Sequence, residues 1–316
     1  MLKQFIKASA LALFLAIEAH AGSFAFITNQ LDNSVSVLDT GKKQVVETIA
    51  VSGKPAGVAV NPKLPRVYIS TPEGGGFSVL DSDRLEVTGS VKAGGASLGI
   101  ATDSLGTKVF VADWYENTVD VFDSLTLVRL RTIQVGQSPS GMTASPDNRW
   151  LYVANRMDDS VSQIDLANLT VRNTTKVGAH PFGITVSSDG QRIYTANVES
   201  DDVTVLTPDH LKRLATVKVG SRPYATALAL NDSRLFVTNQ DDGTVSVIDT
   251  DTLELVGVVE VGEKPEGIST HPDDKQVYVA NWFDGTVSVI DAETLQVTAT
   301  VEAGDGSRAF GRFMMK

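Results

Sequence analysis

Five basic or titratable side chains recur at spacings related to one period of 42 residues. Lys54, His180, Arg222 and Lys264 are separated by 126, 42 and 42 residues, and Arg308 follows Lys264 by 44. If one period is one structural repeat, these side chains meet in space. Arginine holds a carboxylate or phosphate through paired hydrogen bonds, lysine acts as a point charge, and histidine titrates near neutral pH. The pattern predicts a site for an anion.

Two aromatic pairs occupy a second position of the same period. Trp114 and Tyr115 precede Trp282 and Phe283 by 168 residues, which is four periods. Large aromatic side chains on exposed turns often anchor a ligand or partner. The alternative is packing against the neighbouring repeat, because aromatic rings are rarely left fully exposed. The sequence leaves both interpretations open.

The basic residues allow three interpretations. We predict a binding or interaction protein whose ligand is a small anion, an acidic peptide, or an acidic patch on a partner such as a periplasmic dehydrogenase. The alternative is a lyase or lactonase in which His180 is the general base and the arginines stabilise an enolate or oxyanion. The third is that these side chains are solvated or pair with acids such as Glu263 and Glu266. An enzyme is not the favoured prediction.

No motif indicates a cofactor or a metal. The chain contains no cysteine, which excludes thiol catalysis, iron–sulfur clusters and covalent haem attachment. His180, His210 and His271 stand in separate turns without zinc-ligand spacing, and neither a GxSxG elbow nor a glycine-rich phosphate loop is present. We expect no cofactor and no metal. The net charge of −11 also argues against a general binder of nucleic acid.

The elements that position these residues repeat seven times. Similar pentapeptides begin every 42 residues, at Ala25, Val67, Val109, Leu151, Ile193, Leu235 and Val277. In the last unit, "VYVAN", "TVSVID" and "QVTATVEAG" are short β-rich runs separated by turns, and a fourth run follows the "KPEG" turn in the preceding unit. Four strands per unit without helical periodicity predict an all-β, seven-bladed propeller over residues 22–316.

The two ends of the chain are expected to meet in one blade. Residues 308–316 align without a gap with the inner-strand segments of the other repeats, and residues 24–51 supply only three strands. Joining them removes two exposed sheet edges. In such a blade the turn into the inner strand and the turn between the second and third strands emerge on one face. The basic residues and the aromatic pairs would then ring the mouth of the central channel.

The repeated residues carry a family resemblance. "YVAN…GTVSVID", with its "KPxG" and "SPDG"-type turns, resembles the YVTN-repeat β-propellers of exported bacterial and archaeal proteins, from Phe24 to the C-terminus. The resemblance implies the seven-bladed fold. Proteins of this kind include cell-surface proteins, propeller subunits of periplasmic dehydrogenases, a streptogramin lyase and lactonases. Function must therefore be argued from the site.

Residues 1–21 have the composition of a cleavable export signal. Lys3 and Lys7 precede an apolar run over residues 8–17, and "AHA" provides a small-residue cleavage site. The run is too short to span a bilayer, which needs about 20 residues. No cysteine follows it to accept a lipid. We expect a periplasmic monomer that is not inserted in the membrane.

Overall fold

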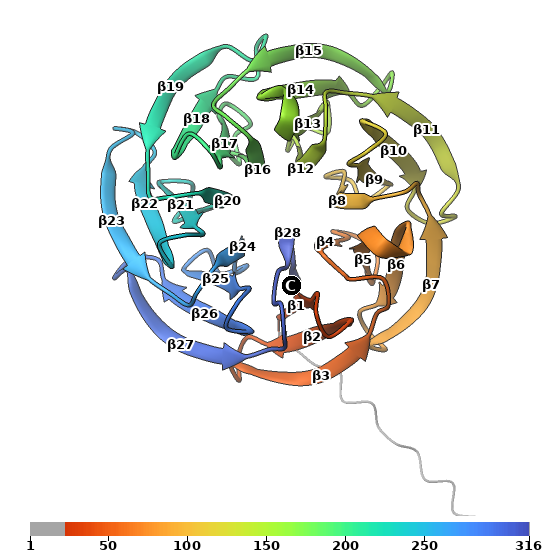
Figure 1. Ribbon diagram of the computed structural model, residues 1–316, viewed down its shortest axis with the longest axis horizontal. Coiled ribbons are helices and arrows are strands. Elements are labelled where there is room, and N and C mark those ends of the chain that lie inside the picture. The colour runs from red at the N-terminus through yellow and green to blue at the C-terminus, as the bar shows by residue number, and fades with distance from the viewer. Residues whose placement is uncertain (1–22, 316) are drawn as a thin grey trace, which may run out of the picture.

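Seven β-sheets surround a central channel in the computed structural model, which describes residues 23–315 (Figure 1). Six sheets have four strands and one has five. The predicted all-β, seven-bladed propeller is confirmed, whereas the expected signal segment, 1–21, lies outside the described residues. Two single-turn 3-10 helices are present, η1 (Pro72–Gly74) and η2 (Arg156–Asp158). Within 23–315, no helix has the length and apolar character needed to cross a membrane.

Each blade runs from an inner strand at the channel to an outer strand at the rim. The inner strands are β29 (Met314–Met315), β4 (Gly57–Val60), β8 (Ser97–Thr102), β12 (Pro139–Ala144), β16 (Pro181–Val186), β20 (Pro223–Ala229) and β24 (Pro265–Thr270). The second strands are β1 (Phe24–Asn29), β5 (Arg66–Thr71), β9 (Lys108–Asp113), β13 (Trp150–Asn155), β17 (Ile193–Asn197), β21 (Arg234–Asn239) and β25 (Gln276–Asn281).

The third and outer strands complete the blades. The third strands are β2 (Ser34–Asp39), β6 (Gly76–Asp81), β10 (Thr118–Asp123), β14 (Ser160–Asp165), β18 (Asp202–Leu206), β22 (Thr244–Asp249) and β26 (Thr286–Asp291). The outer strands are β3 (Gln44–Ala50), β7 (Glu86–Lys92), β11 (Arg129–Gln134), β15 (Thr170–Lys176), β19 (Arg213–Lys218), β23 (Leu255–Glu260) and β27 (Gln296–Glu302).

The core lies between neighbouring blades. Every residue of β1 and β2 is buried, because both faces of these strands pack against another blade. One repeated position in the second strand holds a fully buried aromatic ring in all seven blades: Phe26, Tyr68, Phe110, Tyr152, Tyr194, Phe236 and Tyr278. The outer strands are mostly exposed and bury little beyond one residue near their ends. The residues that repeat in the sequence therefore form the packed interfaces between blades.

The chain closes the ring as expected, with a difference in register. β29 pairs with β1, joining Met315 to Phe24 and Met314 to Ala25, and a bridge joins Ser307 to Asn29. The 42-residue period alone would place Arg312 opposite Ala25, whereas Met314 stands there, two residues further along the chain. The reason is a bulge between Ser307 and Met314 that adds two residues to the inner strand.

The bulged segment forms an additional short strand, β28 (Phe310–Arg312). It leaves the first blade and pairs in parallel with β4 of the next blade, with Arg312 beside Ala59. Figure 1 shows β28 on the channel side of the ring. Gly311 has a φ of 101°, which a residue with a Cβ rarely adopts. The last strand therefore belongs to two blades and reaches into the channel.

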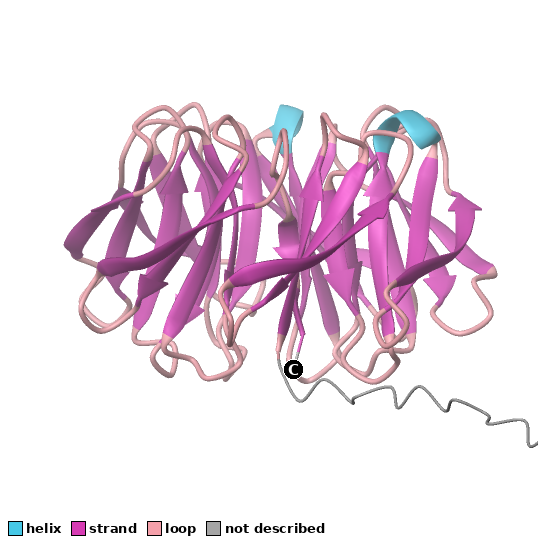
Figure 2. Cartoon of the chain, turned by 90° about the horizontal axis from the view of Figure 1, so that it is seen from below, coloured by secondary structure: helices cyan, strands magenta, loops and turns pink. Residues whose placement is uncertain are grey.

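Both predicted classes of loop lie on one face of the disc, which we call the mouth face. Figure 2 shows η1 and η2, which lie between second and third strands, on one face, and the C-terminal end on the other. Backbone hydrogen bonds tie each inner-strand turn to the adjacent loop, as from Trp282 N to Lys264 O at 2.9 Å and from Arg156 N to Ser138 O at 3.1 Å. The two sets of candidate residues are therefore neighbours.

Candidate functional site

The basic residues of the predicted ring stand at equivalent turns. Lys54, His180, Arg222 and Lys264 all have left-handed backbones, with φ between 53° and 56°. The N–H of His180 donates to Asp159 Oδ1 at 2.8 Å, and that of Arg222 to Asp201 Oδ1 at 2.8 Å. A carboxylate of the preceding blade thus holds the turn, and the side chain is left to face the mouth.

Acids on the same face neutralise two of these cations. Arg222 Nη1 lies 2.7 Å from Glu199 Oε1, and its Nε lies 3.8 Å from Asp241 Oδ2. Lys264 Nζ lies 2.7 Å from Asp241 Oδ1. All these side chains are partly exposed. The interpretation in which the basic residues pair with acids fits Arg222 and Lys264, whose partners are Glu199 and Asp241. It also fits Arg308, which pairs with Glu266 as expected.

Arg308 belongs to a buried network. Its Nε lies 2.7 Å from Glu266 Oε2, its Nη2 donates to the Tyr224 hydroxyl at 2.6 Å, and its Nη1 donates to Gln30 Oε1 at 3.3 Å. Gln240 donates to the other oxygen of Glu266 at 2.7 Å. Burial raises the pKa of Glu266 and of Tyr224, while Arg308 acts in the opposite direction on both. The guanidinium is occupied by the protein itself.

His180 and Lys54 differ from the paired cations. His180 Nδ1 lies 3.9 Å from Glu199 Oε1, the oxygen that also accepts from Arg222, and it has no hydrogen-bond partner. The Lys54 ammonium forms no hydrogen bond or ion pair with the residues of 23–315. The predicted residues Arg222, Lys264 and Arg308 are therefore brought together with His180 close to them, and Lys54 stands at the corresponding turn of another blade.

Arg156 is a mouth residue that the sequence reasoning did not select. Its guanidinium stacks 5.8 Å from the centre of the Phe182 ring and forms no hydrogen bond or ion pair with any described residue. Burial lowers the pKa of Arg156. The 42-residue period could have identified Arg156 as a mouth residue, because it shares the loop position of Trp114 and Trp282. Among the arginines that residues 23–315 place at the mouth, Arg156 has the guanidinium that is free for a ligand.

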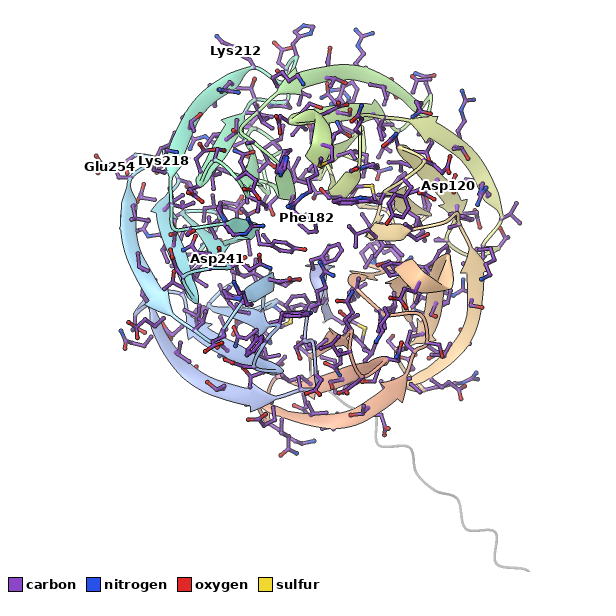
Figure 3. All side chains as sticks on the ribbon, in the orientation of Figure 1. Asp120, Phe182, Lys212, Lys218, Asp241 and Glu254 are labelled. Atoms are coloured by element: carbon purple, nitrogen blue, oxygen red, sulfur yellow. The ribbon has the colours of Figure 1, made fainter. Side chains whose placement is uncertain are left out.

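Three aromatic rings pack together at the channel beneath these cations. Phe182 stacks on Tyr224 with ring centroids 4.0 Å apart and meets Phe310 edge-on at 5.3 Å. Figure 3 shows Phe182 at the inner edge of the ring of blades. Arg308 lies over both Tyr224 and Phe310. We call Phe182, Tyr224 and Phe310 the aromatic plug.

The two predicted aromatic pairs divide into inner and outer residues. Trp114 packs against the buried cluster that contains the aromatic plug, and Trp282 lines a hollow at the mouth. Tyr115 and Phe283 point outward and are 75% and 68% exposed. Leu31 and Met157 share their loop position and are 52% and 51% exposed. Trp114 is therefore a packing residue, whereas Tyr115 and Phe283 are exposed. Leu31 and Met157 are exposed at the same loop position and were not predicted from the sequence.

The plug separates two hollows. The mouth hollow, of about 440 Å³, is lined by Gln30, Arg222, Gln240, Asp241, Lys264, Glu266, Trp282 and Arg308. The channel cavity on the other side has a volume of about 640 Å³ and is lined mainly by inner strands. Within 23–315, no group of three or more His, Asp or Glu side chains is arranged to hold a metal.

A seven-bladed propeller with a charged mouth is the class of protein that these features define. Parts of the chain match two family models. Residues 199–309 match a cytochrome D1 heme domain, and residues 126–210 match a seven-bladed β-propeller lactonase. Each match spans less than half of the chain, so neither assigns it to a family. No curated protein matches the chain.

Solved propeller structures are similar to a larger part of the chain than the two family models are. A structure of Kuenenia stuttgartiensis hydrazine synthase is 23% identical with a TM-score of 0.79, covering 85% of this chain and 92% of that chain. A protein of unknown function from Desulfotomaculum acetoxidans is 14% identical with a TM-score of 0.80, covering 91% and 97%. The dihydro-heme d1 dehydrogenase NirN, in complex with DHE, is 17% identical with a TM-score of 0.68, covering 88% and 63%. At these identities the likeness shows the fold alone.

The mouth hollow does not fit a haem. Haem iron in proteins is held by His, Met, Cys or Tyr side chains. The eight residues that line the hollow include none of these types. Tyr224, immediately below, is buried and its hydroxyl accepts from Arg308. The lining of this hollow therefore supplies no axial ligand for haem iron.

Proposed function

We propose that this protein is an interaction module whose mouth face docks a protein partner that presents an acidic patch beside apolar side chains. The observation that carries the proposal is the position of Leu31, Tyr115, Met157 and Phe283, four exposed apolar side chains around one charged mouth. Large apolar side chains on exposed loops can serve as anchors of a protein interface. Aromatic residues and methionine are also enriched at protein interfaces.

Charge supports a partner more than a small free anion. Glu199, Asp241 and Glu266 already pair with the arginines and the lysine of the mouth hollow, which leaves little net attraction for a small anion there. The unpaired cations, Arg156 and Lys54, lie in other blades. A broad acidic surface can contact both, and electrostatic attraction of this kind speeds association and fixes orientation.

Family, location and partner class belong to the same proposal. The repeat sequence supports membership of the YVTN-repeat propellers, and the segment 1–21 supports export to the periplasm. Hydrazine synthase and a dehydrogenase, named among proteins of similar fold, support an enzyme such as a periplasmic dehydrogenase as the partner. Sequencing the N-terminus of the protein recovered from the periplasm tests the location, and a start at Met1 would contradict it.

A second candidate, an enzyme of the lyase or lactonase type, is favoured by one observation. His180 Nδ1 faces a carboxylate oxygen of Glu199 that also holds Arg222, an arrangement that resembles a base oriented by an acid. In this case His180→Ala would abolish turnover of a lactone or of a lyase substrate while binding persists. An interaction module shows no turnover with either class.

Site-specific photo-crosslinking tests the docking face. A photoreactive aromatic amino acid is placed at position 115, at position 283, or at position 130 on the outer strand β11, in cells that make the protein. We expect the same covalent adduct from positions 115 and 283, none from position 130, and a weaker adduct when Arg156→Glu is added. Arg131→Glu, on β11, is the matched control for charge. Equal adducts from all three positions would refute a specific mouth interface.

A further inference from the structure

Another cation without a partner among residues 23–315 lies inside the channel. Arg312 is carried by β28, and it lines the cavity of about 640 Å³ on the far side of the aromatic plug. The described residues offer its guanidinium neither a hydrogen bond nor an ion pair. Its side chain is accessible to the solvent of the channel, and burial among the inner strands lowers the pKa of Arg312.

The bulge in the last strand is what puts this cation there. The two additional residues move Phe310–Arg312 out of the first blade and against β4, with Arg312 beside Ala59. Ala59 belongs to one level of the inner strands, and the equivalent positions in the other blades also line the cavity: Ala101, Thr143, Thr185, Ala227 and Ser269. One guanidinium thus shares a level with three hydroxyl groups and three small apolar side chains.

The hydroxyl groups at this level have hydrogen-bonding capacity to spare. Thr143 and Ser269 form no side-chain hydrogen bond with any residue of the described part of the chain. Thr185 donates to Thr226 O at 2.8 Å and is 3.0 Å from the Thr226 hydroxyl. Alanines at the other three positions leave room beside the hydroxyls. The level therefore combines one fixed charge with several neutral donors and acceptors, as ligand pockets do.

The two carboxylates that line the cavity stand at its other end and are engaged. Asp103 accepts hydrogen bonds from the backbone N–H groups of Thr107 and Lys108, and Asp232 accepts one from Ser188 N. Neither is within ion-pair distance of Arg312. Both belong to turns that follow inner strands, so this end of the cavity opens on the face opposite the mouth. A solute that enters there would meet Phe182 and Phe310, which also line the cavity.

We propose that the channel binds a small hydroxylated carboxylate, such as a sugar acid, with its carboxylate on Arg312 and its hydroxyls on Thr143, Thr185 and Ser269. A guanidinium forms two parallel hydrogen bonds with one carboxylate, and a single unpaired guanidinium matches a single acidic group. The volume is within the range of small-molecule sites. This site is separate from the mouth face, and it stands whether or not a partner docks there.

Calorimetric titration of the full chain with gluconate, acetate, phosphate and sulfate tests the proposal. We expect gluconate to bind more tightly than acetate and both to bind more tightly than the inorganic anions. Arg312→Gln should weaken gluconate binding by about tenfold or more, the loss of one charge-assisted pair. Arg312→Lys should weaken it less, because the charge remains without the fork. Arg222→Gln, at the mouth, is the control and should bind as the unaltered protein does.

A second set of variants separates the hydroxyls from the charge. Thr143→Val together with Ser269→Ala should remove the preference for gluconate over acetate while leaving acetate binding unchanged. Unaltered gluconate binding in Arg312→Gln would overturn the site. Binding of phosphate or sulfate as tightly as gluconate would overturn the assignment of a carboxylate, and binding of none of the four anions would overturn the proposal as a whole. Thermal unfolding of Arg312→Gln and of the double variant Thr143→Val, Ser269→Ala verifies that each variant is folded.

Discussion

Arg308 Nε lies 2.7 Å from Glu266 Oε2, and this ion pair joins the end of the chain to the blade before it. Arg308 follows the last outer strand, whereas Glu266 belongs to β24 of the seventh blade. Through Tyr224 and Gln30 the same guanidinium also contacts the sixth and first blades. The pair therefore fastens the ring at the point where its two ends meet.

Breaking this pair should destabilise the protein strongly. Arg308→Met leaves the Glu266 carboxylate buried without a counter-ion, which costs about 3–5 kcal/mol in comparable buried pairs. The free energy of unfolding from urea titration measures the loss. The double variant Arg308→Met, Glu266→Leu should be less destabilised than the single variant, because no charge is left behind. A single variant as stable as the unaltered protein would show that the pair does not fasten the ring.

The exposed pairs of the mouth should behave differently. Lys264 Nζ and Asp241 Oδ1 are also 2.7 Å apart, but both side chains are about 40% exposed. We expect Lys264→Gln to change the free energy of unfolding by less than about 1 kcal/mol, because water and salt screen such pairs. Urea titration at low and high salt checks this. A loss as large as that of Arg308→Met would mean that the mouth cations are structural.

The repeat could be predicted from the sequence because its cause is local. Each blade needs a fully buried aromatic ring at the position that Tyr68 and Tyr278 occupy. An aromatic residue therefore recurs every 42 residues. The neutralising acids followed the same period: Glu199 and Asp241 share the loop position of Phe283. Their shared loop position could be found in the sequence, and it indicates that they lie in neighbouring loops. It does not show which side chain turns toward Arg222.

The bulge could not be predicted, because nothing in the period requires it. The 42-residue period continues through residues 308–316 without a gap, and the structure places Phe313 and Met314 between the first and last blades in a register two residues away. Arg312 and its place in the channel depend on that register. Residues 308–316 depart from the repeat, and their position could therefore be obtained only from the structure.

Phe313 should contribute a large share of the stability of the closure. Its side chain is fully buried in the cluster between the first and seventh blades. Phe313→Ala should lower the free energy of unfolding by about 3–5 kcal/mol through lost burial and the cavity that remains. Phe283→Ala, at a side chain 68% exposed, should change it by less than about 0.5 kcal/mol. Equal effects in chemical denaturation would refute the role of the last strand.

Acid should weaken the fold through the turn carboxylates. The Thr126 N–H lowers the pKa of Asp123, and the Thr294 N–H lowers the pKa of Asp291. Because each pKa is lower in the folded than in the unfolded chain, the stabilisation is present above about pH 4 and is lost as pH falls through the folded values. Asp123→Asn with Asp291→Asn keeps an oxygen acceptor but cannot titrate. Its free energy of unfolding should fall less steeply below pH 4, and Glu293→Gln serves as the control.

The bulge should require a glycine at position 311. Its φ is 101°, and a Cβ added there would lie 2.5 Å from the Val58 carbonyl oxygen of β4. Gly311→Ala should therefore destabilise the protein by about 1–3 kcal/mol and release β28 from β4. At Gly89 an added Cβ meets nothing within 4 Å, so Gly89→Ala should be neutral or stabilising by up to about 1 kcal/mol. Thermal unfolding compares the two variants, and amide hydrogen exchange along β4 reports whether β28 is displaced. If Gly311→Ala matches Gly89→Ala in both measurements, β28 does not hold the position from which Arg312 reaches the channel.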